Sequence, residues 1–123
     1  MYSAELMDHF EHPRHVGELA APDAAAEVEN PACGDVMALQ LELAGETITA
    51  ARYRAKGCLP AIGCGSALTE LLIGKTLAQA RALPREQIVA AVGGLPPASE
   101  HASHLAMAVL SAALKNLGEG KRK

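Results

Sequence analysis

Two short segments of the chain place cysteine where a metal ion could bind. The first is Cys33-Gly34-Asp35 and the second is Gly57-Cys58. If the backbone near Asp35 is extended, residues two apart point to the same side, so the Cys33 sulfur and the Asp35 carboxylate share a face and can hold one ion. A turn aspartate beside a half-buried thiol would explain the same segment without any metal.

Cys58 lies at the expected start of a helix. An alternating pattern ends before Gly57, and apolar residues at helical spacing follow from Pro60 onwards. A thiol at a helix N-terminus is close to the positive end of the helix dipole and to unpaired N–H groups, which lower its pKa and favour the thiolate. Because the thiolate is the form that binds soft metal ions, Cys58 is a further candidate ligand.

A predicted β-hairpin brings the two segments together. Residues 36–43 and 47–54 alternate between apolar and polar, and the connection between them contains Gly45. Cys33 precedes the first strand and Cys58 follows the second, so antiparallel pairing carries both to the same end of the sheet. This convergence favours a metal site over a purely structural role for the two thiols.

The remaining pattern predicts one α+β domain over residues 1–123, with a small three-stranded antiparallel sheet packed against a layer of helices. A short edge strand is expected at 26–29, and Ser99 is the expected N-cap of a last helix that ends before Gly118. Residues 95–97 should be extended and exposed, and residues 118–123 should form a flexible basic tail. The other expected helices span residues 4–11, 60–73, 77–82 and 85–92.

Cys64 and His101 are further candidate ligands that lie on apolar helix faces. Cys64 shares a stripe with Leu68, where a free cysteine can be a core side chain, a metal ligand or a sulfur carrier. At about 100° per residue, His101 faces inward with Leu105, Ala108 and Ala112, whereas His104 faces nearer to solvent. His101 is therefore the better candidate of the two histidines, with a core histidine as the alternative.

Three more histidines, at positions 9, 12 and 15, look like a series of ligands near the start of the chain. Pro13 interrupts any helix that would align them on one face. They are a weak indication of a metal site.

Composition argues against several classes of function. The 123 residues carry a net charge of -3 and 2% aromatic residues, whereas nucleic-acid binding needs a basic face or stacking aromatics. The chain starts without a basic, apolar signal segment, and its most apolar stretch, residues 105–114, is well short of the ~20 residues that span a bilayer. We therefore expect a cytoplasmic protein with no membrane or nucleic-acid partner and no hydrolase activity.

The cysteine count limits the kind of metal site. Three thiols, expected to stay reduced in the cytoplasm, cannot form a four-thiolate site within one chain. Any tetrahedral centre must add a carboxylate, a histidine or an exogenous ligand.

The order and spacing of four motifs resemble the iron-sulfur cluster assembly scaffold family, which comprises the IscU proteins and the NifU N-terminal domain. The motifs are residues 8–17, residues 31–37, Gly57-Cys58, and residues 95–97 followed by His101. The resemblance runs from Tyr2 to about Leu117. It implies that Cys33, Asp35 and Cys58 are ligands of a cluster or of zinc, with His101 beside the site.

The resemblance also implies a function. Members of this family hold a labile [2Fe-2S] cluster or Zn²⁺, accept sulfur from a pyridoxal-phosphate cysteine desulfurase, and pass the cluster to apo iron-sulfur proteins. Such a scaffold has no catalytic turnover of its own. The expected partners are therefore a cysteine desulfurase and apo-proteins.

Two departures from the family pattern are visible. The family usually has a third cysteine directly after its histidine, and here that position is Ala102, so Cys64 is the only thiol left to replace the usual sulfur acceptor. The proline motif read by the dedicated heat-shock chaperone normally continues with Val-Lys and here continues with Ala98-Ser99, which makes chaperone-assisted release doubtful.

Three functions remain open at this point. The first is a cluster scaffold or carrier, and the second is a zinc-bound sulfur acceptor that works with a desulfurase. The third, motivated by Ala102, is an interaction module that has kept the fold and lost its metal. Metal content and colour after anaerobic reconstitution separate them.

Overall fold

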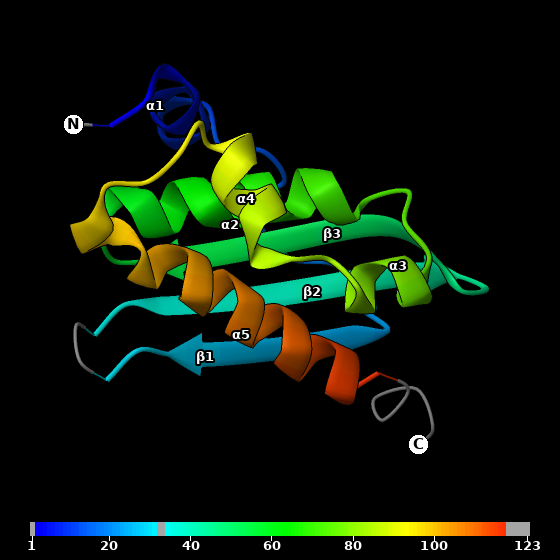
Figure 1. Cartoon of the computed structure of the whole chain (residues 1–123). Coiled ribbons are helices and arrows are strands. Elements are labelled where there is room, and N and C mark those ends of the chain that lie inside the picture. Colours follow the sequence, from blue (N-terminus) through cyan, green and yellow to red (C-terminus); the bar gives the residue numbers. More distant parts are fainter. Residues whose placement is uncertain (1, 32–33, 118–123) are drawn as a thin grey trace.

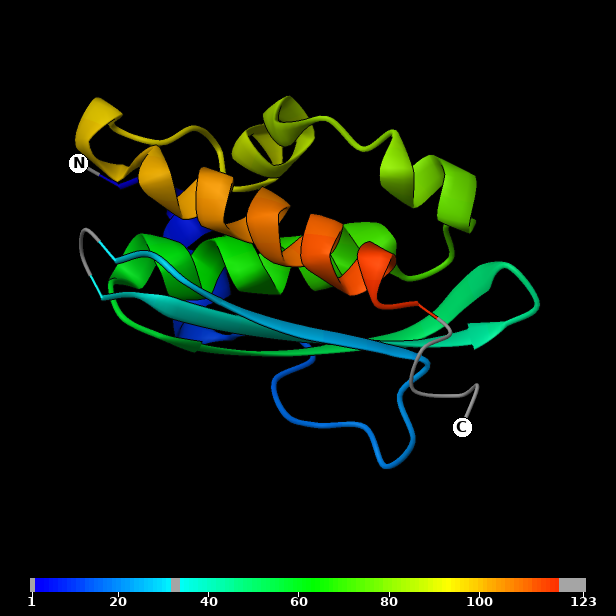
Figure 2. The ribbon, with the colours of Figure 1, turned by 90° about the horizontal axis from the view of Figure 1, so that it is seen from below.

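The computed structural model describes residues 2–31 and 34–117 and has two layers (Figure 1). One layer is an antiparallel sheet in the order β1-β2-β3, and the other is a set of helices on one face of that sheet (Figure 2). The expected α+β class is confirmed. The predictions for Cys33 and for the tail at 118–123 lie outside the described residues. The strands are β1 (Ala24–Glu29), β2 (Val36–Ala44) and β3 (Thr47–Lys56).

The helices follow the predicted spans closely. Two of them, α2 and α5, pack directly on the sheet, and α1 packs on α2. In the part of the chain that is described, no helix combines the length and the apolar character needed to cross a bilayer. The helical elements are α1 (Ala4–Glu11), α2 (Leu59–Leu72), α3 (Leu77–Arg81), α4 (Arg85–Ala91), the 3₁₀ turn η1 (Pro97–Ser99) and α5 (His101–Lys115).

The hairpin has the register that the alternating pattern requires. Met37, Leu39 and Leu41 are completely buried under the helices, while the residues between them face the other side. Because side chains alternate along a strand, a one-residue slip would expose this entire row. Val36 pairs with Lys56 at the open end of the hairpin, so the residues just before β2 and just after β3 are neighbours.

The start of the last helix differs from the prediction. Ser99 is not its N-cap: Ser99 is buried in the 3₁₀ turn, and Glu100 caps α5 without a side-chain hydrogen bond. Pro96 and Leu95 are half-buried, so the segment before the turn is less exposed than expected. A 3₁₀ turn that starts at Pro97 uses a residue with a fixed φ and no N–H to donate, and this shifts the helix start past Ser99.

The buried face of α5 is also rotated from the predicted one. Ala102, Leu105 and Ala106 are buried, whereas Ala108, expected on the inner face, is exposed. His101 therefore lies at the margin of the core face rather than in its middle. The edge strand β1 begins at Ala24, two residues earlier than the pattern indicated.

Candidate metal centre

Three potential metal ligands meet at the open end of the hairpin. The carboxylate of Asp35, the thiol of Cys58 and the imidazole of His101 each offer one donor atom, and these atoms lie within 4.8 Å of one another. Cys58 Sγ is 3.0 Å from Asp35 Oδ2 and 3.7 Å from His101 Nε2. Asp35 Oδ2 is 3.8 Å from His101 Nε2.

Each donor comes from a different element that ends or begins at this point. Asp35 directly precedes β2 and is 5% exposed, and Cys58, separated from the end of β3 by Gly57, is the N-cap of α2. His101 is the first residue of α5, which packs on α2. A backbone hydrogen bond of 2.7 Å from the Asn30 N–H to the Asp35 carbonyl holds the approach to β2. The site therefore depends on the hairpin register and on the packing of two helices.

The donor set fits a tetrahedral ion. Zinc bonds of about 2.3 Å to sulfur and about 2.0–2.2 Å to nitrogen and oxygen place tetrahedral ligand atoms about 3.4–3.6 Å apart. The observed separations of 3.0, 3.7 and 3.8 Å bracket that range. The His101 side chain is 36% exposed and Cys58 is half-buried, so an ion or a partner can reach the donors from outside.

Of the five predicted ligands, the structure brings together Asp35, Cys58 and His101 and places Cys64 elsewhere. Cys64 is completely buried in the hydrophobic core, and burial raises the pKa of its thiol to about 12. A neutral, inaccessible thiol is a poor ligand and a poor nucleophile. Cys33 precedes Asp35 by two residues in the sequence, and its ligand role stays a prediction.

Replacing Cys64 with alanine should leave metal binding intact. We expect the metal content per chain to match the wild type, because the Cys64 thiol is separated from solvent by the core that surrounds it. The free energy of unfolding should fall by about 1 kcal/mol, because the buried sulfur atom is lost from the core. Atomic absorption and urea denaturation measure the two effects. A loss of metal with unchanged stability would instead make Cys64 a ligand.

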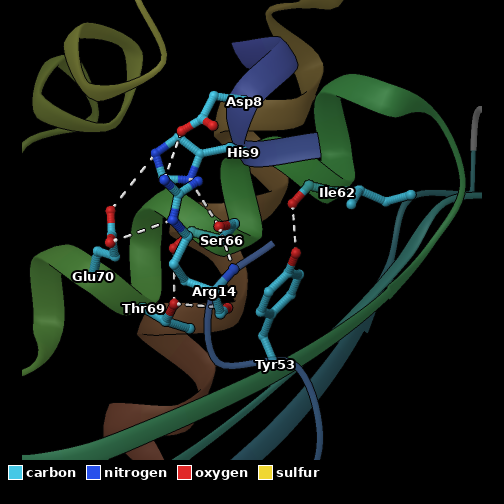
Figure 3. A network of polar contacts seen from close by, with 8 residues as sticks. All are labelled: Asp8, His9, Arg14, Tyr53, Ile62, Ser66, Thr69 and Glu70. Carbon is cyan, nitrogen blue, oxygen red and sulfur yellow. Dashed lines mark hydrogen bonds and ion pairs between the residues drawn. The ribbon is translucent and has the colours of Figure 1, made fainter. Parts of the chain in front are cut away.

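A second polar cluster, which sequence reasoning missed, joins α1 to α2 (Figure 3). His9 is 7% exposed, and its Nδ1 lies 2.7 Å from Ser66 Oγ on α2. The Arg14 backbone N–H donates to the same Ser66 oxygen at 2.9 Å. The Arg14 guanidinium also forms a 2.6 Å ion pair with Asp8. A serine among the apolar residues of a buried helix was the signal that could have indicated this cluster.

The contacts of this polar cluster determine which ring nitrogen of neutral His9 carries the proton. Arg14 Nη1 lies 3.4 Å from His9 Nδ1, and since a guanidinium only donates, Nδ1 accepts. The proton is then on Nε2, which faces the Glu70 carboxylate at 3.7 Å. Burial, followed by the charge of Arg14, lowers the pKa of His9 below its usual 6.5, while Glu70 and Asp8 oppose that shift.

The stability of the protein should fall as the medium becomes acidic. The folded state lowers the pKa of His9 below its ordinary value of 6.5. The stabilisation from neutral His9 is therefore complete above pH 6.5 and is lost as the pH falls through the lowered pKa. Urea denaturation between about pH 8 and 5 measures this trend. His9→Gln should flatten it, and His104→Gln, on the exposed side of α5, should preserve it. A slope that His9→Gln leaves unchanged would exclude His9 as its source.

Fold and site together define a small α+β protein with an oxygen, sulfur and nitrogen donor set at one end of its sheet. The family described as the NifU-like N terminal domain matches residues 1–123, and the chain belongs to that family. The family expected from the sequence motifs is thereby confirmed.

Curated relatives carry names that refer to iron-sulfur cluster assembly. The iron-sulfur cluster assembly scaffold protein IscU of Azotobacter vinelandii is 39% identical over 94% of this chain and 92% of its own length. The Haemophilus influenzae protein of the same name is 39% identical over 92% of both chains. The scaffold protein IscU 1 of Archaeoglobus fulgidus is 37% identical over 93% of this chain and 74% of its own length.

Solved structures confirm the fold. The N-terminal NifU-like protein from Brucella abortus superposes with a TM-score of 0.76 at 19% identity, over 95% of this chain and 94% of that one. A putative cluster assembly scaffold for the SUF system from Fervidobacterium islandicum gives a TM-score of 0.73 at 21% identity, over 92% and 96% of the two chains.

Proposed function

We propose that this protein is a scaffold or carrier on which an iron-sulfur cluster is assembled and from which it is passed to apo-proteins. The observation that carries the proposal is the convergence of Asp35, Cys58 and His101 at a site open to solvent. The names of the relatives, each an iron-sulfur cluster assembly scaffold, support it. The cytoplasmic location expected from the sequence stays a prediction.

The proposed cluster ligands are Cys33, Asp35 and Cys58, with His101 beside them. Ala102 is completely buried and offers no donor, so this chain lacks a third thiolate next to His101. One iron position is then left for an exogenous thiolate, such as one from a cysteine desulfurase that supplies the sulfur or from the apo-protein that receives the cluster. A [2Fe-2S] cluster, which needs four ligands, fits this arrangement.

The mixed donor set suits a carrier better than an electron-transfer protein. Thiolates bind iron-sulfur clusters strongly, whereas a carboxylate is a hard ligand that matches a soft centre less well. A cluster held by two thiolates and a carboxylate is therefore more easily displaced than one held by four thiolates. Asp35, only 5% exposed and close to Cys58, is the residue that supplies this weakness.

A zinc-bound sulfur acceptor is the second candidate function. The separations between the three donors are close to those of a tetrahedral zinc site, and Cys33 would supply the fourth ligand. In that function the metal orients a thiol for sulfur transfer and no cluster is built.

Anaerobic incubation with ferrous iron, cysteine and a cysteine desulfurase tests the proposal. The expected product has charge-transfer absorption in the visible region, a Mössbauer spectrum of a [2Fe-2S] cluster, and a cluster that moves to an apo-ferredoxin. A colourless protein with one zinc per chain would favour the sulfur acceptor. If the protein bound neither iron nor zinc, the remaining function would be an interaction module that has lost its metal.

A further inference from the structure

Gly57 lies against the side chain of Asp35, and no L-side chain fits between them. A Cβ atom added to Gly57 would overlap the Oδ1 and Cγ atoms of Asp35 and lie 2.9 Å from its Cβ. Real Cβ atoms essentially never approach other heavy atoms so closely. The space that glycine leaves open is therefore occupied by the carboxylate itself.

The hairpin explains why these two residues meet. Val36 pairs with Lys56 in the last step of the β2-β3 ladder, so Asp35 and Gly57 are the next residues on either side of it. The φ angle of Gly57 is +149°, a conformation that residues with a side chain rarely adopt, and it turns the chain from β3 into the N-cap of α2. The same residue thus brings Cys58 into the site and leaves room for Asp35.

The carboxylate has little freedom to move elsewhere while it stays in the site. Asp35 is 5% exposed, and its Oδ2 is near both Cys58 Sγ and His101 Nε2. A Cβ atom at residue 57 would push the Oδ1 and Cγ atoms of Asp35 away from their present positions. Because the carboxylate is a rigid group, its Oδ2 atom must move with them. Any side chain at residue 57 therefore removes the oxygen donor from the site.

We propose that Gly57 is a positioning residue of the metal centre, which acts by holding the carboxylate of Asp35 beside Cys58 and His101. The inference rests on the proposed function of the site, and it adds a residue that binds no metal itself. It predicts that Gly57→Ala has the metal-binding defect of a protein without the Asp35 side chain.

Binding of Zn²⁺ and Co²⁺ to four variants of the full chain tests this role. Gly57→Ala should lower Zn²⁺ affinity about 10–100-fold, the usual effect of losing support for a metal ligand. It should also shift the Co²⁺ ligand-field bands to those of Asp35→Gly. In Asp35→Gly, which removes all three overlapping atoms, a further Gly57→Ala change should cost much less affinity than it costs the wild type, because only the backbone strain at residue 57 remains. This non-additivity identifies the contact as the cause.

Gly17 provides a matched control for backbone strain. Its φ of +133° is as unfavourable for alanine as that of Gly57, but a Cβ there would meet nothing within 4 Å, and it lies in the loop between α1 and β1. Gly17→Ala should lower the thermal midpoint and keep the wild-type Co²⁺ spectrum. A crystal structure of metal-free Gly57→Ala should show the Asp35 carboxylate turned away from Cys58.

Each contrary result has a distinct meaning. Wild-type affinity and spectrum in Gly57→Ala, or additive losses in the double variant, would overturn the positioning role. If Gly57→Ala does not fold, the double variant should recover folding, and failure of both would also overturn it. If the wild type binds neither ion and forms no cluster on reconstitution, the proposed function fails, while the metal-free crystal structure still tests the position of Asp35.

Discussion

Cys58→Ala is expected to lose more than about 100-fold in metal affinity and to form no stable cluster on reconstitution. The Cys58 sulfur is within reach of both other donors, at 3.0 Å from Asp35 Oδ2 and 3.7 Å from His101 Nε2. Without its sulfur, the described part of the site offers one oxygen and one nitrogen, a set that binds iron-sulfur clusters poorly. Metal analysis and visible absorption after anaerobic reconstitution and desalting measure the loss.

The matched control is Cys64→Ala, which removes the other thiol in the described part of the chain. Both variants lack one cysteine, but Cys64 is completely buried and Cys58 is half-buried at the open end of the hairpin. The two variants should therefore differ in metal content. Equal loss in both would show that the assay measures thiol number or stability. Full metal loading of Cys58→Ala would show that Cys58 is not a ligand of the proposed site.

The hairpin and its open end could be predicted from the sequence because both are local features. Alternation over two adjacent runs, joined at Gly45, favours a register that buries Met37 and Leu39. The ladder departs from that register only near the turn, where it shifts between Glu42 and Leu43. Once that register is fixed, residues before β2 and after β3 must be neighbours. The closeness of Asp35 and Cys58 follows from the pattern alone, without knowledge of the helices.

The position of His101 depends on contacts that the sequence does not show. Helical periodicity put it on the inner face with Ala108, but α5 is rotated so that Ala102 and Ala106 pack inward and Ala108 is exposed. The rotation is set by packing of α5 on α2 and the sheet and by the 3₁₀ turn before it. His101 reaches the site because it lies at the edge of that face.

His9 illustrates the same limit. The predicted helix at residues 4–11 is present. The burial of His9 results from the packing of α1 on α2, where its imidazole contacts the Ser66 hydroxyl. A contact across 57 residues of chain leaves no periodic signal in either segment. The overlap that would arise at Gly57 is equally invisible in the sequence, because it depends on how Asp35 is oriented across the sheet.

Asp35→Ala is expected to slow cluster transfer to an apo-ferredoxin by about tenfold and to leave more cluster on the protein after desalting. The carboxylate is the hardest donor of the proposed site and the one that an incoming thiolate displaces first. Once it is removed, His101 Nε2, which lies 3.8 Å from the former position of Oδ2, can take the vacant iron position with a softer nitrogen ligand. Transfer is followed by absorbance or circular dichroism of the acceptor.

The sign of this effect separates a carrier from a simple metal site. Loss of the Asp35 side chain should lower the affinity for Zn²⁺, because Zn²⁺ readily accepts carboxylate oxygen. The same variant should still hold the cluster, because the cluster prefers softer donors. Asp35→Glu keeps the carboxylate and should still transfer, whereas Asp35→Ala with His101→Ala should release its cluster quickly because no nearby nitrogen remains. If Asp35→Ala transferred faster than the wild type, the carboxylate would be stabilising the cluster, and the role of Asp35 in release would be wrong.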